Sequence, residues 1–506
     1  MATHHILAML APAWGHTISY LYLAVQLLNK DPALVITILQ HNQVVSQMEK
    51  ELLTCTYDKK RLRILGVGDK DVVFGPNMLL TLFEQLTDGW FEALPPLAQG
   101  NEGWPRPQAI HFAFACGGQV IEATKPIVGP DCKTLVLVPC ATASMIAHFN
   151  EYDIAAIARE IYEDEARRDG RSMDEILPQV SASWNGSDKL SGIVVKNPGV
   201  PDMYDYERVS YAAGPPGGLF SQLLIPAQKL AKAVDGYIVT TGVYFEPIGV
   251  PYCQEYYRKR GQEIFAVGMQ THELDFSEAV HGVAPSNELV SLFLQNALSE
   301  CGPKSVLYIS FGSFFFPVAT PQLVEALVTT LLDLETPFPF IFSLGAQMAS
   351  LPEELIERVN TSGKGLVCDF WVEQRAILQH AALGWFLTHG GFNSVTESLI
   401  RGIPMIIWPV GAEQPINAAF LSAEPNPVAM ELIQIRTGPQ IGPSLRGGPK
   451  ITGTTEDASK EFKAVFEAAR SVRGEILRAN AVKMAKAMRE ARAGEASEEI
   501  IRLARF

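Results

Sequence analysis

The stretch from Trp371 to Gln414 carries residues suited to a ligand with a flat ring, hydroxyl groups and phosphates. Within it, residues His389 to Ser394 read HGGFNS, where a predicted strand ends and a predicted helix begins. The first amides of a helix have no partners inside the helix and face the positive end of its dipole, so this turn can bind a diphosphate. Glycine-rich turns have other uses, and this segment alone is weak evidence.

Three further side chains in this stretch suit the rest of such a ligand. Trp371 follows a predicted strand at a loop, where its ring could stack on a pyrimidine or could simply belong to a core. Gln374 could bind the edge of a base or ribose, or could only cap the following helix. Glu397 lies four residues after Asn393 on one helix face, and could accept both ribose hydroxyls or be a solvated charge.

The spacing of these residues resembles the signature box of family 1 UDP-glycosyltransferases, best known from plant enzymes of small-molecule metabolism. Many matches within one uninterrupted window make this a specific signal. They are Trp371, Gln374, Leu378, His380, Gly384, Phe386, His389, Gly391, Asn393, Ser394, Glu397, Gly402, Pro404, Trp408, Pro409, Glu413 and Gln414. The resemblance implies an α/β protein of the GT-B fold, with two Rossmann-like parallel-sheet domains facing across a cleft. It also implies a UDP-sugar as the donor substrate.

The resemblance assigns a part of UDP to each group. It places Trp371 on uracil, Glu397 on the ribose, and His389, Asn393 and Ser394 on the phosphates. Upstream, residues 306–313 read VLYISFGS, and Gly312 and Ser313 would add diphosphate contacts, although a serine after a glycine is also common in plain turns. The full set of expected donor-binding residues is Gly312, Ser313, Trp371, Val372, Gln374, His389, Gly391, Asn393, Ser394, Glu397, Glu413 and Gln414.

The sugar is expected to meet an acid and an amide. Glu413 and Gln414 follow the end of a predicted strand at Trp408-Pro409, where they could bind several sugar hydroxyls. A glutamine at the last position resembles users of glucose more than users of galactose, so glucose is the first expected sugar and xylose the second. Phe392 departs from the family because it replaces the usual tryptophan and removes an N–H donor near the sugar.

His16 is the expected catalytic base. Residues 12–16 read PAWGH at the end of the first predicted strand, similar to the family loop whose histidine takes the proton from the acceptor hydroxyl. An ordinary histidine pKa of about 6.5 suits this role at neutral pH. We therefore expect a single in-line displacement that inverts the anomeric carbon. Helix amides and His389 would stabilise the leaving diphosphate, so neither a metal nor another cofactor is expected.

The sequence lacks one feature of the family near this base. Family members usually carry an aspartate that orients the histidine, but the matching residues 108–114 read QAIHFAF, without a carboxylate. The missing aspartate would stand in the region His111-Phe112. His111 itself, or Glu122 further along the chain, could support His16 instead. Alternatively, the acceptor could need less activation, or the activity could be low. A UDP-sugar-binding protein that has lost catalysis is therefore a competing interpretation.

The expected acceptor is a lipophilic alcohol or phenol, such as a terpenoid, a sterol or a polyphenol. In this family the N-terminal domain chooses the acceptor. Aromatic residues at Trp90, Phe91, Tyr204, Tyr206 and Phe314 to Phe316 could line its pocket, although scattered aromatics more often belong to a core. A nicotinamide-dependent dehydrogenase also fits two α/β halves, but no GxGxxG motif follows a predicted strand.

Two series of short apolar runs, separated by helix-like stretches, position these motifs. This alternation is typical of βαβ units and predicts parallel sheets, whose ligands bind at the carboxyl ends of the strands. We expect an N-terminal acceptor domain over 1–268, a linker over 269–285, a donor domain over 286–474, and C-terminal helices over 475–506 that could cross back to the N-terminal domain. Predicted strands are 6–11, 35–39, 62–67, 134–138 and 237–240, then 306–311, 338–343, 366–370, 385–388 and 404–408.

The composition of the 506 residues supports a globular protein. It is 47% hydrophobic with a net charge of -14, which disfavours a nucleic-acid partner. The seven cysteines lack CxxC spacing, no long apolar run suggests a membrane span, and no basic start suggests a signal peptide. We expect a cytoplasmic monomer without a metal-ligand cluster.

Overall fold

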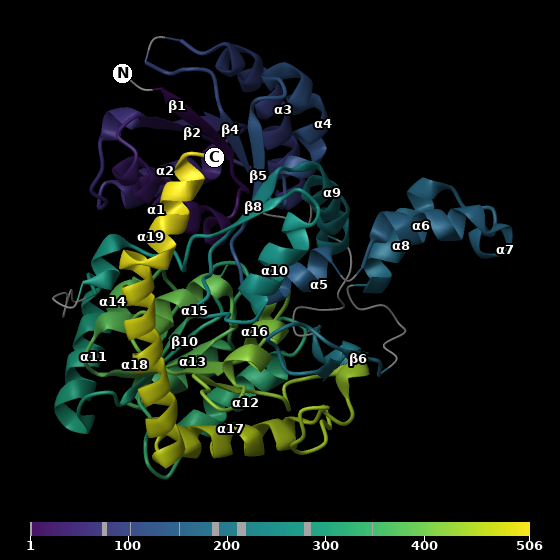
Figure 1. The fold of residues 1–506 in the computed structure, drawn as a ribbon. Coiled ribbons are helices and arrows are strands. Elements are labelled where there is room, and N and C mark those ends of the chain that lie inside the picture. The colour runs from purple at the N-terminus through teal and green to yellow at the C-terminus, as the bar shows by residue number, and fades with distance from the viewer. Residues whose placement is uncertain are drawn as a thin grey trace. The chain divides into compact units, whose positions relative to one another are not determined.

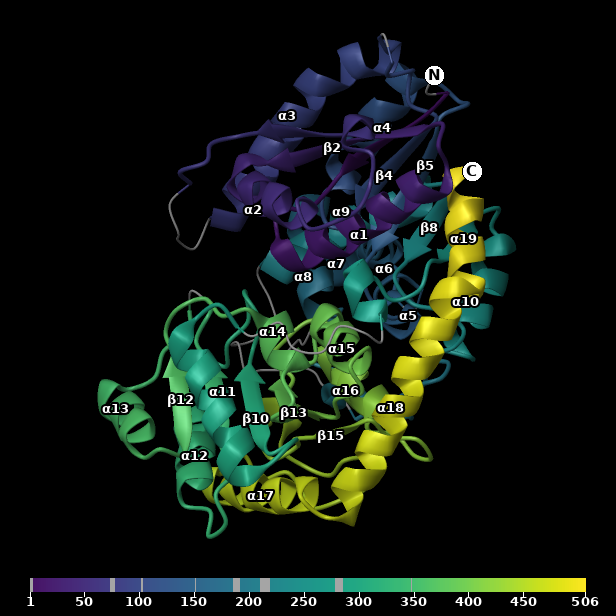
Figure 2. The same cartoon turned by 90° about the vertical axis from the view of Figure 1, so that its left-hand side faces the viewer.

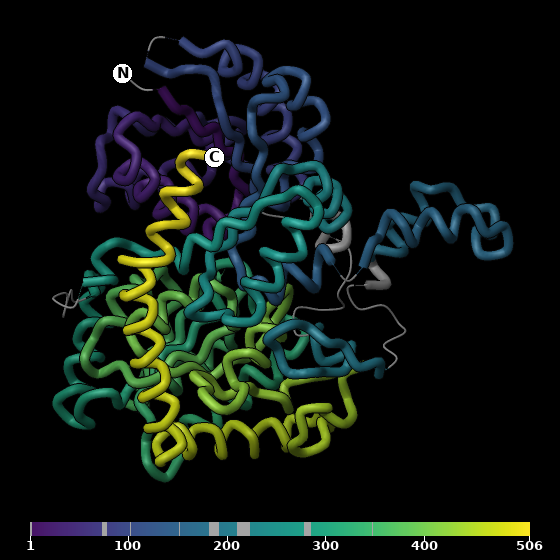
Figure 3. The backbone as a smooth tube through the Cα atoms, in the orientation of Figure 1, coloured from purple at the N-terminus to yellow at the C-terminus, as the bar shows by residue number. Residues whose placement is uncertain are grey.

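The computed structural model of the chain describes two compact units. The described residues are 3–72, 78–101, 103–150, 152–184, 192–209, 219–277, 285–346 and 348–506. Unit 1 contains Met1–Ser181, Gly218–Glu273 and Glu490–Phe506, and unit 2 contains Ala182–Gly217 and Leu274–Arg489. Figures 1 and 2 show the elements from two sides, and Figure 3 traces the backbone. Residues 278–284 of the predicted linker lie outside the described residues.

Unit 1 is built on a parallel sheet of seven strands within the described residues, in the order β3-β2-β1-β4-β5-β8-β9. Its central strands are apolar and almost fully buried, as a sheet covered on both faces requires. The strands are β1 (His4–Met9), β2 (Leu34–His41), β3 (Leu62–Val67), β4 (Ala109–Ala113), β5 (Lys133–Val138), β8 (Gly236–Val239) and β9 (Glu263–Ala266).

Helices cover this sheet. The Trp90 side chain of α3 packs on Phe112 of β4, and its indole N–H donates to Thr124 of α4 at 2.9 Å. The last helix, α19, packs on β9, where Arg502 Nη1 donates to Glu263 at 2.9 Å. The helices of unit 1 are α1 (Trp14–Lys30), α2 (Asn42–Leu52), α3 (Met78–Gln99), α4 (Gly117–Val128), α5 (Thr142–Phe149), α6 (Ile154–Glu163), α7 (Glu165–Arg168), α8 (Met173–Trp184), α9 (Leu219–Ala233), α10 (Gly249–Arg258) and α19 (Glu495–Ala504).

Unit 2 is built on a second parallel sheet, with six strands in the order β12-β11-β10-β13-β14-β15 among the residues described. Its core is aromatic: the Trp408 ring is fully buried and stacks on Phe462 at 5.6 Å. The strands are β10 (Val306–Ser310), β11 (Phe340–Ser343), β12 (Gly365–Cys368), β13 (Leu383–Thr388), β14 (Met405–Ile407) and β15 (Ala429–Glu431).

Three helices of unit 2, namely α14, α15 and α16, begin at or beside expected donor-site residues. Helix α12 begins with Thr320 as the N-cap and Pro321 in the first turn, a pairing that favours a helix start. The helices are α11 (Glu288–Cys301), α12 (Pro321–Leu332), α13 (Glu353–Thr361), α14 (Gln374–Gln379), α15 (Phe392–Leu399), α16 (Gln414–Leu421), α17 (Thr455–Ala469) and α18 (Val472–Ala493), whose last residues belong to unit 1.

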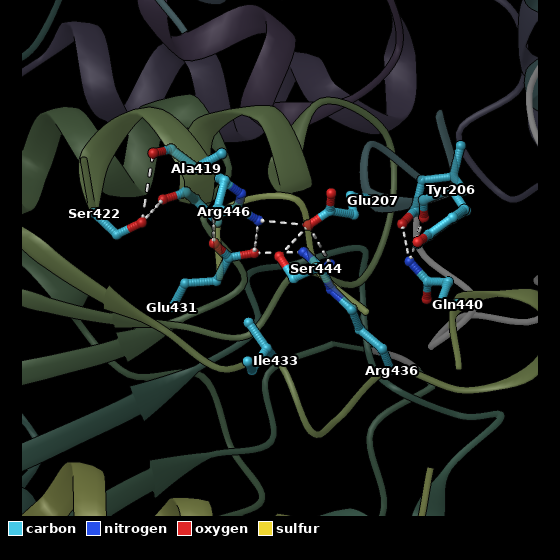
Figure 4. Close-up of polar contacts among 12 residues, drawn as sticks. Tyr206, Glu207, Ala419, Ser422, Glu431, Ile433, Arg436, Gln440, Ser444 and Arg446 are labelled. Carbon is cyan, nitrogen blue, oxygen red and sulfur yellow. Dashed lines mark hydrogen bonds and ion pairs between the residues drawn. The ribbon is translucent and has the colours of Figure 1, made fainter. Parts of the chain in front are cut away.

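A segment that the sequence assigns to the N-terminal half, residues 192–209, packs instead with unit 2 (Figure 4). It carries the two-stranded sheet of β6 (Val194–Val195) and β7 (Met203–Tyr204). The buried Glu207 carboxylate lies 3.7 Å from both Arg436 and Arg446 and accepts the backbone N–H of Leu445 at 3.1 Å. These contacts anchor the segment through a charge pattern that strand and helix periodicity does not reveal.

Among the described residues, no helix is long and apolar enough to cross a membrane.

Candidate functional site

The expected phosphate site lies where the strand order of the second sheet reverses. Strands β10 and β13 are parallel neighbours, and the sheet extends from them in opposite directions. In open α/β sheets, ligands bind at such a switch point, outside the carboxyl ends of the strands. The loop after β10 carries Gly312 and Ser313, and the turn after β13 carries His389 and Gly391.

The His389 imidazole fills the space between these two loops. A Cβ atom on Gly312 would lie 2.8 Å from His389 Cε1, and a Cβ on Gly391 would collide with Nε2 of the same ring. Gly312 also has a φ of +81°, in the region that favours glycine. Gly312 and Gly391 therefore lack side chains at the positions where their backbone approaches the His389 ring closely.

Burial lowers the pKa of His389 to about 4, although a hydrogen bond involving the Ser310 backbone opposes the shift. The ring is therefore neutral at physiological pH and offers a hydrogen bond rather than a full charge to an anion. Its Nδ1 lies 3.3 Å from Thr388 Oγ1, and Phe315 packs at 5.9 Å between ring centroids.

Helix α15 begins directly after this turn. Its N-cap, Gly391, has no side chain to cap the first amides, so a bound anion can take that role. Asn393 is half-buried and Ser394 is buried, while the amide of Asn417 donates to the Gly390 carbonyl at 2.9 Å and holds the turn. The predicted strand-to-helix geometry of this segment is confirmed.

The expected base- and ribose-binding residues touch each other. Gln374, the first residue of α14, donates from Nε2 to Glu397 Oε2 on α15 at 2.8 Å. Burial raises the pKa of Glu397, and the nearby Arg401 and Gln374 oppose this. Glu397 is half-buried and paired with Gln374, so it is not a freely solvated surface charge.

Trp371 is not a core residue. Its side chain is 61% exposed on the loop after β12, whereas Val372 beside it is buried. An exposed indole fixed at the end of a strand can stack on a flat ring. Ser313 is likewise exposed on the loop after β10.

The two residues expected to bind the sugar, Glu413 and Gln414, differ in their surroundings. Burial raises the pKa of the half-buried Glu413, while backbone hydrogen bonds from Glu413 itself and Phe392 oppose the shift. The fully buried Gln414 accepts the N–H groups of Val410 and Gly411 at 2.8 Å each through Oε1. Only its amide N–H₂ group therefore remains for a sugar hydroxyl.

The aromatic residues considered for the acceptor pocket fall into separate groups. Trp90 and Phe316 are buried in the cores of their own units, so their assignment to a pocket is wrong. Phe91 and Phe314 are partly exposed. Tyr204 and Tyr206 belong to unit 2 and stack on each other at 5.1 Å; Phe315 packs against His389 instead.

His16 lies at the corresponding switch point of unit 1, between the parallel neighbours β1 and β4. It is the third residue of α1, and its ring centroid lies 5.3 Å from that of Phe114 in the loop after β4. Burial lowers its pKa to about 4, which keeps the ring in the neutral form that a general base needs. Its Nδ1 atom is buried and has no hydrogen-bond partner among the described residues.

Neither candidate support for His16 bonds to that nitrogen. His111 Nδ1 pairs with the hydroxyl of Tyr20 at 2.8 Å. Glu122 forms an exposed ion pair with Lys229 at 2.8 Å. In the described structure both side chains therefore bond to residues other than His16. The direction in which a side chain points cannot be read from its position in the sequence.

Sequence reasoning missed the buried Asp275, which contacts Arg375, Gln379 and Arg401 near the Gln374–Glu397 pair. Long sequence separation hides such a cluster from motif reading. Within the part of the chain that is described, no group of three or more histidine, cysteine, aspartate or glutamate residues could hold a metal ion.

Comparison with known protein families supports the donor-site interpretation. Residues 273–437 match the family described as UDP-glucoronosyl and UDP-glucosyl transferase. UDP-glycosyltransferase eriJ of Hericium erinaceus is 32% identical over 286 residues, covering 55% of each chain. Nuatigenin 3-beta-glucosyltransferase of Solanum aculeatissimum is 30% identical over 248 residues, covering 49% of this chain and 47% of the relative. The chain therefore spans about half the length of the curated relatives it matches.

Solved plant glycosyltransferases share the fold over nearly the whole chain. Medicago truncatula UGT71G1, solved with UDP-glucose, aligns with a TM-score of 0.67 and 20% identity over 99% of this chain and 98% of the other. Phytolacca americana UGT2 aligns with the same TM-score and 16% identity over 99% of each chain. The predicted GT-B class, with two Rossmann-like parallel-sheet units, is confirmed. The family match over residues 273–437 and these curated relatives show that this part of the chain is similar to UDP-glucoronosyl and UDP-glucosyl transferases.

Proposed function

We propose that this protein is an inverting glycosyltransferase that moves a sugar from a UDP-sugar to a hydroxyl of a lipophilic small molecule. The observation that carries the proposal is the switch point of unit 2. There, His389 lies between two glycine loops just before α15, the helix whose Glu397 accepts a hydrogen bond from Gln374. Diphosphate, ribose and base thus each have a partner of suitable chemistry in one unit.

The proposed reaction is one displacement. His16 accepts the acceptor hydroxyl proton on a ring nitrogen as the acceptor oxygen forms its bond to the anomeric carbon. The bond from that carbon to the UDP oxygen breaks with its electron pair, so UDP leaves from the opposite face and the configuration inverts. Helix amides of α15 and the neutral His389 would stabilise the charge that grows on the diphosphate.

Glucose is the first proposed donor sugar, and xylose is the second. The buried Gln414 keeps its amide N–H₂ for a hydroxyl, and Glu413 supplies a carboxylate beside it. The proposed acceptors are terpenoid, sterol or polyphenol hydroxyls. Relatives named for nuatigenin and solanidine glucosylation support this class.

The main test measures turnover and binding separately. UDP-glucose is incubated with a panel of phenols, terpenoid alcohols and sterols, and glycoside formation is followed by mass spectrometry. In parallel, UDP and NAD are compared for protection against thermal unfolding. We expect glycoside formation and protection by UDP alone. Protection by NAD instead of UDP would favour a dehydrogenase.

A second candidate function is a UDP-sugar-binding protein without catalysis, because the buried Nδ1 of His16 has no partner among the described residues to orient the base. In that case UDP protects the protein, yet no acceptor in the panel is glycosylated. The same panel therefore separates the two candidates.

A donor screen sharpens the proposal for the sugar. UDP-glucose, UDP-xylose, UDP-galactose and UDP-glucuronate are compared with wild type and with Gln414→Glu. The glutamate can keep an oxygen for Val410 and Gly411 but lacks the amide donor. We expect weaker sugar discrimination with UDP affinity changed by less than about threefold. An equal loss of UDP affinity would show that Gln414 does not contact the sugar.

We also propose a cytoplasmic monomer. All seven cysteines are free, and a reducing compartment suits thiols that form no disulfide. Imaging of the tagged chain in its native cell and light scattering of the purified protein test these two points.

A further inference from the structure

One buried carboxylate joins the two helices that carry the expected base- and ribose-binding residues. Asp275 lies on a short 3-10 helix, Glu273–Phe276, and its side chain has no exposed surface. Its Oδ1 atom accepts from Arg401 Nη2 at 2.5 Å, and lies 3.4 Å from Arg375 Nη2. The amide of Gln379 also donates to it, at 3.1 Å.

Each arginine is placed beside a residue of the expected site. Arg375 follows Gln374 directly in the first turn of α14. Arg401 follows the end of α15, and its Nη1 donates to the backbone carbonyl of Glu397 at 2.7 Å. Asp275 therefore ties the start of α14 to the end of α15.

This tie bears on the 2.8 Å hydrogen bond between Gln374 and Glu397, which joins the same two helices. A carboxylate that binds ribose hydroxyls must be held within about half an ångström of its productive position. Surface-exposed ion pairs do little to fix such geometry, but a buried carboxylate with two guanidinium partners is costly to leave unpaired. Arg401 is 8% exposed and Asp275 is fully buried, so this cluster is of the second kind.

We infer that Asp275 is a positioning residue, which holds Gln374 and Glu397 in register for the ribose of a uridine nucleotide through Arg375 and Arg401. This inference rests on the proposed function, since it concerns the same nucleotide site. Asp275 itself has no assigned contact with the ligand, and its effect passes through the two helices.

The test compares two nucleotides that differ by one hydroxyl. Isothermal titration calorimetry gives the affinities of UDP and 2′-deoxy-UDP for wild type, Asp275→Asn and Arg375→Gln. For wild type we expect about a tenfold preference for UDP, as the loss of a hydrogen bond to a charged group predicts. Asp275→Asn should weaken UDP binding about fivefold and so reduce the preference to about twofold, whereas 2′-deoxy-UDP binding changes little.

Arg375→Gln guards against a failure of Asp275→Asn to fold. Arg375 is 30% exposed, so the glutamine is tolerated, and the preference for UDP should fall by about threefold. Asp333→Asn is the matched control, because Asp333 pairs with Arg358 at 3.0 Å on the surface of the same unit. It should leave both affinities unchanged.

A double-mutant cycle with Glu397→Ala completes the test. If Asp275 acts through Glu397, the double variant should bind UDP no more weakly than Glu397→Ala by itself. The inference is overturned if Asp275→Asn loses equal affinity for both nucleotides and its effect adds fully to that of Glu397→Ala. It is also overturned if folded Arg375→Gln keeps the wild-type preference for UDP. If wild type does not bind UDP at all, the proposed function fails first, and the two failures are distinguished.

Discussion

Each unit has a histidine at the switch point of its sheet, but the surroundings of the two histidines differ. Burial lowers the pKa of both His16 and His389 to about 4. In unit 2 the polar groups of the expected site are paired: Gln374 bonds to Glu397, and Asn417 holds the turn before α15. Around His16 the ring nitrogen Nδ1 is buried without a hydrogen-bond partner in the described residues.

The difference between the two surroundings suits two different roles, nucleotide binding in unit 2 and proton transfer in unit 1. A site that binds a constant nucleotide gains from groups that are already paired and rigid, because little order is lost on binding. A base that must accept a proton gains from a neutral ring in an apolar setting, next to Phe114. The comparison predicts that changes in unit 1 alter turnover, whereas changes in unit 2 alter nucleotide affinity.

The largest expected effect comes from His16→Ala. Loss of a general base lowers kcat by about a hundredfold to ten-thousandfold, while UDP affinity stays within about twofold. Turnover of UDP-glucose with an acceptor from the panel and calorimetric UDP affinity check the two parts. His4→Ala, at an exposed histidine that pairs with Asp31, is the control and should be active. Unchanged kcat would remove His16 from the mechanism.

The second effect comes from Gly391→Ala in unit 2. The φ of Gly391 is -63°, so the backbone accepts alanine, but the new Cβ would occupy the space of His389 Nε2. The ring or the start of α15 must move, and a displacement of about 1 Å can cost roughly a hundredfold in a positioned site. We expect UDP affinity to fall about tenfold to a hundredfold, as measured by calorimetry.

Ser459→Ala is the control for this substitution. Ser459 lies on α17 of the same unit, where its hydroxyl donates to the backbone carbonyl of Thr455 at 2.9 Å, away from the turn at His389. UDP affinity should therefore stay within about twofold of wild type. Equal losses in the two variants would show that the close approach to His389 is not what matters.

A pair of tryptophans in unit 2 separates binding from stability. Trp371→Ala removes an exposed ring and should weaken UDP binding about tenfold, as loss of base stacking predicts, with the unfolding free energy almost unchanged. Trp408→Ala removes a fully buried ring and should cost about 3–5 kcal/mol of stability. Thermal melts and calorimetry read both effects. A large loss of stability in Trp371→Ala would speak against a binding role.

The smallest expected change is the response of activity to moderate acid. Because burial lowers the pKa of His16 to about 4, the ring stays a free base until the pH falls toward about 4. The acceptor kcat/KM, measured at saturating donor with an alcohol that does not ionise, should therefore change less than about twofold between about pH 7.5 and 5.5. An acid limb near the ordinary histidine pKa of about 6.5 would show that the ring is solvated.

The lowered pKa of His16 also makes the unfolding free energy depend on pH. The unfolded His16 binds a proton below its ordinary pKa of about 6.5, whereas the folded ring stays neutral down to about 4. Between these values the unfolded state holds more protons, so the unfolding free energy falls as the pH is lowered. His389 contributes in the same direction.

Much of the fold follows from local sequence. Apolar runs predict β3 at its observed bounds, 62–67, and place β1, β2 and β10 to within two residues at either end. Helix α12 begins where threonine and proline predict. Strand β4, which contains His111, was not predicted from an apolar run. Only the resemblance to the family indicated a strand at this position. Residues 192–209 pack with unit 2 through Glu207, whose ion-pair partners lie more than two hundred residues away.

The sequence by itself indicated the donor chemistry that we propose, because residues from Trp371 to Gln414 lie close together in the chain and would act through backbone turns and helix faces. Tertiary structure decided what depends on distant side chains. It exposes Trp371, buries Trp90, turns His111 to Tyr20, and brings Asp275 to two arginines. The physical reason is range: turns and helix ends are set by neighbours in sequence, whereas burial and ion pairing are set by which elements the sheet order brings together.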